Sequence, residues 1–201
     1  MKVKICGVTR YADARLALDL GAWALGLNFY ARSPRFIAPD AAAALLKRLP
    51  KETLSFAVVV DEPRESLQQL VDHVGVRCVQ LHGDEPPELA RALRAEIVVK
   101  AFRVGPSFEL SRLGLYPGPW TLLDASVPGQ PGGTGRTFDW SIARKAAETA
   151  SIILAGGITP SNVAVALAAA APAAIDVASG IESSPGIKDP DKLRALFRAV
   201  G

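Results

Sequence analysis

The sequence contains few residues of the kinds that hold metal ions or form disulfides. Its 201 residues include two cysteines, Cys6 and Cys78, and two histidines, His73 and His82. The cysteines lie far apart in the chain, without CxxC spacing and without the cysteine density of a small secreted disulfide scaffold. A structural zinc site is therefore excluded, and we expect no metal in this protein.

Long apolar runs are missing as well. No run reaches the roughly 20 residues that a membrane helix requires, and the basic N-terminus leads into a strand pattern and not into the apolar core of a signal peptide. These absences predict a cytoplasmic protein that makes no membrane contact.

Aromatic residues are scarce, at 6% of the chain, and Lys and Arg are scattered singly although the formal net charge is +3. A nucleic-acid platform gathers basic and aromatic residues on one surface. The composition therefore argues against nucleic acid as a partner. A mildly basic chain is, however, compatible with an anionic small-molecule substrate.

What the chain does contain is a regular alternation of short β-type runs and helix-length segments, which is typical of a parallel α/β domain. Each unit takes about 25 residues, so eight units fill residues 1–201 as a single domain and favour a closed (β/α)8 TIM barrel. An open doubly wound sheet is the competing architecture, but the first turn, "CGVTR", is not the glycine-rich turn of that fold. The expected strands are 3–6, 24–30, 54–61, 78–83, 97–104, 121–126, 152–157 and 175–179.

Proline marks the expected helix starts. It stands near the first turn of five of them, at positions 39, 63, 86, 106 and 160, where its missing N–H costs nothing. The last helix, expected over 189–200, carries Leu193, Leu196 and Phe197 at helical spacing.

Polar residues at the C-terminal ends of the expected strands are the candidates for chemistry, because barrel enzymes hold their active sites at that end. Strand alternation places Lys4 and Cys6 on one face of the first strand, with Cys6 nearer the mouth of the barrel. Asp124 reaches the mouth from the opposite wall, where a thiol and a carboxyl would form an acid–base pair. Either residue could instead be structural, Cys6 as a small core residue and Asp124 as a loop cap.

Two further side chains share a face at the end of the fourth strand, Gln80 and His82, and a histidine in that place is also a common partner of loop hydrogen bonds. An interior lysine needs a carboxylate partner. Because the eighth strand closes the barrel beside the first, we expect Asp176 to neutralise Lys4.

Glycine-rich loops follow the last three expected strands. Their backbone N–H groups near helix starts are suited to binding phosphate, especially after the seventh and eighth strands. A loop after the second strand carries Arg35, which could bind a substrate carboxylate in bidentate fashion or simply face solvent. The candidate phosphate-binding residues are Gly133, Gly135, Gly156, Gly157, Ser179 and Gly180.

Eight segments in series resemble the phosphoribosylanthranilate isomerase family: "KICGVTR", "DARLALDLGA", "NFYARSPRFI", "VQLHGDE", "LLDA", "PGGTGRTFDW", "LAGGITPSNV" and "DVASGIESSPGIKD". The resemblance implies a barrel enzyme of tryptophan biosynthesis. Such an enzyme converts N-(5-phosphoribosyl)anthranilate into 1-(2-carboxyphenylamino)-1-deoxyribulose 5-phosphate by an Amadori rearrangement, without a metal or a cofactor.

The resemblance also implies roles for single residues. Cys6 would be the general base, Asp124 the general acid, and Arg35 the group that engages the anthranilate carboxylate. One departure from the family pattern is Ala178, which stands where the phosphate loop usually has a serine, so a hydroxyl is missing there.

Three alternatives remain at this point. The chain could be another phosphosugar barrel, although an epimerase of that kind uses metal-binding His/Asp sets that this sequence lacks, and an indole-glycerol-phosphate synthase carries an N-terminal extension. It could also be a non-catalytic sensor of phosphate ligands. We expect a monofunctional chain, and the nearly uncharged segment "SNVAVALAAAAPAA" indicates a possible homodimer.

Overall fold

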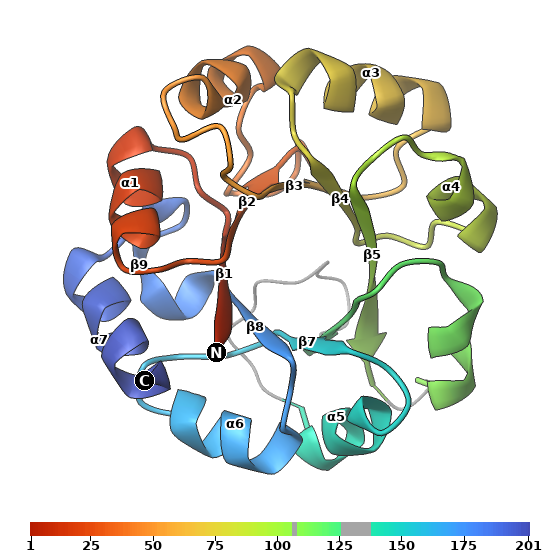
Figure 1. Ribbon diagram of the computed structural model, residues 1–201, viewed down its shortest axis with the longest axis vertical. Coiled ribbons are helices and arrows are strands. Elements are labelled where there is room, and N and C mark those ends of the chain that lie inside the picture. Colours follow the sequence, from red (N-terminus) through yellow and green to blue (C-terminus); the bar gives the residue numbers. More distant parts are fainter. Residues whose placement is uncertain (106–107, 126–137) are drawn as a thin grey trace.

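Eight parallel strands close into a barrel in the computed structural model, which describes residues 1–105, 108–125 and 138–201 (Figure 1). Each strand pairs with the next along the chain, and β8 pairs with β1, so the TIM-barrel prediction is confirmed and the open sheet is excluded. The strands are β1 (Lys2–Cys6), β2 (Ala24–Asn28), β3 (Ser55–Val59), β4 (Cys78–Leu81), β5 (Ile97–Val104), β6 (Thr121–Ala125), β7 (Ile152–Leu154) and β8 (Ala174–Val177).

Helices form a ring outside the strands (Figure 1). They are α1 (Tyr11–Asp19), α2 (Pro39–Leu46), α3 (Arg64–Val74), α4 (Pro87–Ala92), α5 (Trp140–Ala147), α6 (Val163–Ala170) and α7 (Pro190–Val200). The last helix begins within one residue of its predicted start, because the Asp189 side chain caps it by accepting hydrogen bonds from the N–H groups of Asp191 and Lys192.

Between β5 and β6 the expected α-helix is wrong for the described residues. The segment that follows position 107 forms a 3-10 helix, η1 (Leu110–Leu115), and its proline start at 106 lies outside the described residues. Gly114 inside this segment and Pro117, two residues after its end, both oppose a longer helix, which explains the short 3-10 turn.

Several strands end earlier than predicted, each for a local reason. The second strand stops at Asn28, whose side-chain oxygen accepts from the N–H of Tyr30 and turns the chain. The seventh stops at Leu154, because Gly156 and Gly157 adopt positive φ angles of 84° and 65°.

The core has two parts. Most buried apolar side chains pack between the strands and the helices. A smaller cluster fills the barrel itself and includes Phe56, Cys78 and Leu122. At the N-terminal end of the barrel the Lys2 ammonium lies 4.7 Å from the ring centre of Trp120.

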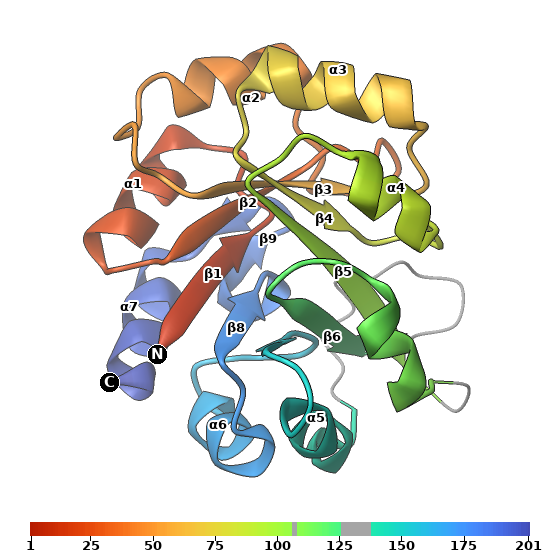
Figure 2. The same ribbon diagram turned by 45° about the vertical axis from the view of Figure 1, so that its right-hand side comes forward.

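The connection from β8 to α7 contains structure that the sequence reasoning did not anticipate. A 3-10 turn, η2 (Ser179–Ile181), leads into an antiparallel hairpin of β9 (Glu182–Ser184) and β10 (Ile187–Lys188). Figure 2 shows β9 beside the arrowhead end of β1. The Thr9 hydroxyl donates to the Gly186 carbonyl at 2.6 Å, so the hairpin is fastened over the loop that follows β1.

Candidate active site

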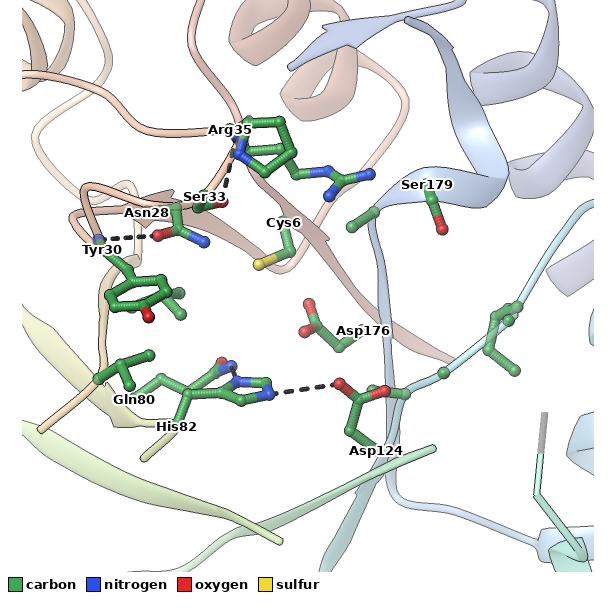
Figure 3. A pocket seen from close by; sticks show the side chains of 18 of the residues that line it. Cys6, Asn28, Tyr30, Ser33, Arg35, Gln80, His82, Asp124, Asp176 and Ser179 are labelled. Atoms are coloured by element: carbon green, nitrogen blue, oxygen red, sulfur yellow. Dashed lines mark hydrogen bonds and ion pairs between the residues drawn. The ribbon is translucent and has the colours of Figure 1, made fainter. Parts of the chain in front are cut away.

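A cavity of about 490 Å³ opens at the C-terminal ends of the strands, and most of the predicted site residues line it (Figure 3). The described part of the chain holds no set of three or more His, Cys, Asp or Glu side chains arranged to bind a metal. The predicted residues that line the cavity are Cys6, Arg35, Gln80, His82, Asp124, Gly156, Gly157 and Ser179. Gly133 and Gly135 lie outside the described residues.

Cys6 ends β1 and points its sulfur toward the cavity (Figure 3). A Cβ added to Gly26 on β2 would lie 2.8 Å from Cys6 Sγ and 3.0 Å from Lys4 Nζ, so glycine leaves the thiol and the ammonium in one small space. Burial raises the pKa of the Cys6 thiol and the Asp176 carboxylate raises it further, while the ammonium groups of Lys4 and Lys188 act in the opposite direction.

The predicted pair of Lys4 and Asp176 is confirmed. Lys4 Nζ lies 2.8 Å from Asp176 Oδ1, across the register that joins β1 to β8, and the lysine is completely buried. Burial alone would lower the pKa of Lys4, but Asp176 and Cys6 outweigh that effect and raise it. The pair is thus an ion pair whose carboxylate also lines the cavity beneath the thiol.

Asp124, on β6, lies beside His82 in the wall of the cavity. Its Oδ2 lies 3.3 Å from His82 Nε2, and its Oδ1 accepts from the N–H of Ala125 at 2.8 Å. The Gln80 amide nitrogen lies 2.9 Å from His82 Nδ1. His82 Nε2 has no hydrogen-bond partner among the described residues, so its approach to Asp124 is a contact and not a hydrogen bond. Gln80 holds the ring from its other nitrogen and places His82 beside this carboxyl.

The loops after β7 and β8 meet at one edge of the cavity. A Cβ added to Gly156 would lie 2.6 Å from the Ala125 backbone nitrogen, and one added to Gly180 would collide with the Ile158 carbonyl oxygen. Glycine is required at both positions for this close approach. Asn162 braces the first loop by donating to the Gly157 carbonyl at 2.8 Å.

Arg35 reaches the cavity from the loop after β2, and its stem crosses Gly7, where an added Cβ would lie 2.5 Å from Arg35 Cδ. Its guanidinium is bound to Glu182, with Nη2 2.7 Å from Oε2 and Nε 3.0 Å from Oε1. The solvent-facing alternative is wrong, because the side chain is 11% exposed and ion-paired. Its expected role toward an anthranilate carboxylate stays a prediction.

Comparisons with known proteins agree with one another. The sequence model of the N-(5'-phosphoribosyl)anthranilate (PRA) isomerase family matches residues 3–199. The chain belongs to this isomerase family. An N-(5'-phosphoribosyl)anthranilate isomerase from Desulforudis audaxviator is 47% identical over 198 residues, which are 98% of this chain and 96% of the relative. One from Citrifermentans bemidjiense is 45% identical over 196 residues, covering 98% and 95%.

Solved structures of the family have the same fold. The phosphoribosyl anthranilate isomerase of Thermus thermophilus superposes with a TM-score of 0.92 at 41% identity, over 100% of this chain and 98% of the other. That of Thermotoga maritima gives 0.89 at 36% identity, over 99% and 98%. The activity is accordingly the isomerisation of N-(5'-phosphoribosyl)anthranilate in tryptophan biosynthesis, and the epimerase, synthase and sensor alternatives are set aside.

Several cavity residues of this family member escaped the sequence reasoning. Asn28 and Val58 line the cavity, and Glu182 holds Arg35 from the hairpin. The hairpin could have been found, because Pro185 and Gly186 form a turn-type dipeptide between two short β-type runs. The partners of its side chains could not, since they depend on how distant loops meet.

Proposed function

We propose that the isomerisation takes place in the mouth cavity, with Cys6 as the general base and Asp124 as the general acid. The observation that carries this proposal is that the two side chains line one cavity from opposite walls, β1 and β6 (Figure 3). Two groups of opposite function at one substrate are what an acid–base rearrangement needs.

The reaction begins with the Asp124 carboxyl. It donates its proton to the furanose ring oxygen as the C1–O bond breaks, which leaves a protonated Schiff base between C1 and the anthranilate nitrogen. The Cys6 thiolate then removes the proton from C2, and the electron pair moves into a C1–C2 double bond. The resulting enol becomes the 2-keto product when the Cys6 thiol returns its proton to C1 and the C2 hydroxyl gives up its own proton, which restores the Asp124 carboxyl, so no atom is gained or lost.

The thiolate is the scarce species in this mechanism. A general base has to be unprotonated, and burial raises the pKa of the Cys6 thiol. Lys4 and Lys188 are the groups whose positive charge opposes burial. We therefore expect the rate to follow the thiolate fraction and to rise with pH.

Substrate binding would use both ends of the ligand. Gly156, Gly157 and Ser179 line the cavity from the loops after β7 and β8, and Gly180 follows directly, so their backbone N–H groups would bind the 5'-phosphate. The Arg35 guanidinium would hold the anthranilate carboxylate. In support, a related isomerase at 34% identity was solved in complex with reduced 1-(o-carboxyphenylamino)-1-deoxyribulose 5-phosphate.

The direct test is to add the purified, folded protein to freshly formed phosphoribosylanthranilate and follow the loss of its anthranilate-type fluorescence. We expect the loss to accelerate in proportion to protein concentration. Decay at the background rate, with folded protein confirmed by circular dichroism, would overturn the proposal.

We also propose that the chain has this single activity, acts in the cytoplasm and forms a homodimer. Relatives are matched over nearly their whole length, which supports one activity. A reducing compartment would keep Cys6 a free thiol. In support of the dimer, one solved structure at 34% identity is of monomers generated from the dimeric isomerase of Thermotoga maritima. Sedimentation analysis tests the dimer, and a single species of monomer mass at micromolar concentration would contradict it.

A further inference from the structure

The hairpin after β8 places two ionisable side chains deep behind the mouth cavity. Glu182 starts β9 and Lys188 ends β10, and their side chains are 4% and 0% exposed. Neither has been given a role in substrate binding above, and Lys188 has entered only through its charge near the Cys6 thiol. A buried charge is costly unless it has partners, so their contacts show what they do.

Glu182 is shared between two cations. Its carboxylate accepts from Arg35 Nη2 at 2.7 Å and from Lys188 Nζ at 2.8 Å, and it also accepts from the N–H of Gly186 at 3.2 Å. Arg35 is therefore not a free cation at the cavity edge. If Arg35 were paired with Glu182 alone, the two side chains together would carry no net charge toward a ligand.

Lys188 carries a positive charge in this arrangement. Its Nζ donates to three oxygen atoms: the Cys6 carbonyl, Glu182 Oε1 at 2.8 Å and the Ala178 carbonyl at 3.5 Å. Three acceptors around one nitrogen, one of them a carboxylate, favour the ammonium form. Burial nevertheless lowers the pKa of Lys188 below its ordinary value, because it outweighs the Glu182 carboxylate, which raises it.

We infer that Lys188 is a specificity-determining residue, which neutralises Glu182 from behind so that the cluster of Arg35, Glu182 and Lys188 keeps one net positive charge for the carboxylate of the substrate. The inference rests on the proposed function, because it takes Arg35 as the group that meets this carboxylate. Lys188 acts through its two partners and need not touch the substrate. This effect on recognition of an anionic ring substituent is separate from the effect of its charge on the Cys6 thiol.

The test compares two probes: reduced 1-(o-carboxyphenylamino)-1-deoxyribulose 5-phosphate and the same compound without its carboxyl group. The measured quantity is the carboxylate preference. We define it as the dissociation constant of the probe without the carboxyl group divided by that of the probe with it, both measured by calorimetry. General damage to the fold weakens both probes together and leaves this ratio unchanged. Loss of a cation that faces the carboxylate lowers the ratio by about tenfold.

Charge arithmetic then gives each variant its own expected result. Lys188→Met leaves a neutral cluster and should lower the carboxylate preference about tenfold. Glu182→Gln leaves two positive charges and should not lower it. The double variant Glu182→Gln/Lys188→Met returns the cluster to one positive charge, and its preference should exceed that of Lys188→Met although more contacts have been lost.

Asp13→Asn is the matched control, because buried Asp13 fastens the same hairpin by accepting from the Lys188 N–H at 3.0 Å. It should keep the wild-type preference. A Lys188→Met preference equal to that of this control, or a double variant no better than Lys188→Met, would overturn the inference. If Lys188→Met does not fold, a Glu182→Gln preference below wild type has the same consequence.

Arg35→Ala separates this inference from the proposal beneath it. Loss of the preference in Arg35→Ala together with an unchanged Lys188→Met rejects the role of Lys188 alone. A wild-type preference in Arg35→Ala rejects the assignment of Arg35 itself, and the inference falls with it.

Discussion

The two cysteines of this chain stand at opposite ends of the same barrel interior. Cys78 begins β4 in the apolar cluster with Phe56 and Leu122, where burial and Glu96 raise its pKa to about 12. Cys6 ends β1 at the mouth, beside two ammonium groups and a cavity. The side chain is the same, so we expect its height in the barrel and its charged neighbours to decide whether a thiol can act as a base or only packs.

The largest effect is expected when the thiol at the mouth of the barrel is removed. Cys6→Ala should lower kcat by about 10²- to 10⁴-fold, the usual contribution of a positioned general base, while Cys78→Ala should leave kcat within about twofold. Steady-state kinetics of both variants check this. Equal kcat values in the two variants would show that another group is the base.

The same kinetic measurement applies to Asp124→Ala, which removes the carboxyl on the opposite wall of the cavity. We expect a similar loss of kcat, with binding of a product analogue retained, because the acid acts in the transition state. Loss of analogue binding without loss of kcat would assign Asp124 to ligand binding and remove it from the chemistry.

The next effect concerns the end of the barrel opposite the mouth, where Cys78 and Phe56 lie. Phe56 is completely buried in the barrel, so Phe56→Ala should cost about 3–5 kcal/mol of unfolding free energy in urea. The kcat of the folded fraction should stay close to that of the wild type, because the substitution lies below the cavity residues. The control is Leu115→Ala at a side chain that is 52% exposed, which should change stability by less than about 0.5 kcal/mol. Equal unfolding free energies in the two variants would show that the apolar cluster around Phe56 does not stabilise the barrel.

Much of this division between the two ends could be predicted from the sequence. Alternation along single strands placed Lys4 and Cys6 on the inner face, and closure of the barrel placed Asp176 beside Lys4. Both deductions use only the period of a strand and the order of strands. They hold because a closed parallel barrel leaves little freedom in either.

The loops were much less accessible to such reasoning. Arg35 and Glu182 are 147 positions apart, and nothing in either local pattern indicates that they meet. The same holds for Lys188 and Cys6, which are joined by a hairpin folded back over the barrel. Strand ends were also predicted too late, because turn geometry at Asn28 and Gly156 overrides an apolar run.

A smaller effect sharpens the role of charge at Cys6. Asp176→Asn removes a carboxylate that raises the pKa of the thiol and frees the Lys4 ammonium, which lowers it. The pKa of Cys6 should therefore fall, and its alkylation at neutral pH should become faster. Iodoacetamide labelling across pH measures this, with Cys78→Ala as the background to remove the second thiol. Slower labelling would contradict the opposing effects of the two groups.

The smallest effect lies at the lower thiol and concerns stability at alkaline pH. Folding raises the pKa of Cys78 from 9.0 to about 12, so its protonated form is favoured in the folded state. As pH rises through this interval the unfolded chain loses the proton while the folded chain keeps it, and stability falls. The loss due to this thiol is at most about 1.4 kcal/mol per pH unit.

Cys78→Ala removes that part of the alkaline slope, while the other groups that ionise in this range still contribute equally to both proteins. Urea unfolding at pH values from about 8 to about 10.5 should therefore give a steeper decline for the wild type than for Cys78→Ala. Parallel declines would mean that the buried thiol ionises as easily in the folded chain as in the unfolded one. Burial in the apolar lower end would then not be what separates Cys78 from Cys6.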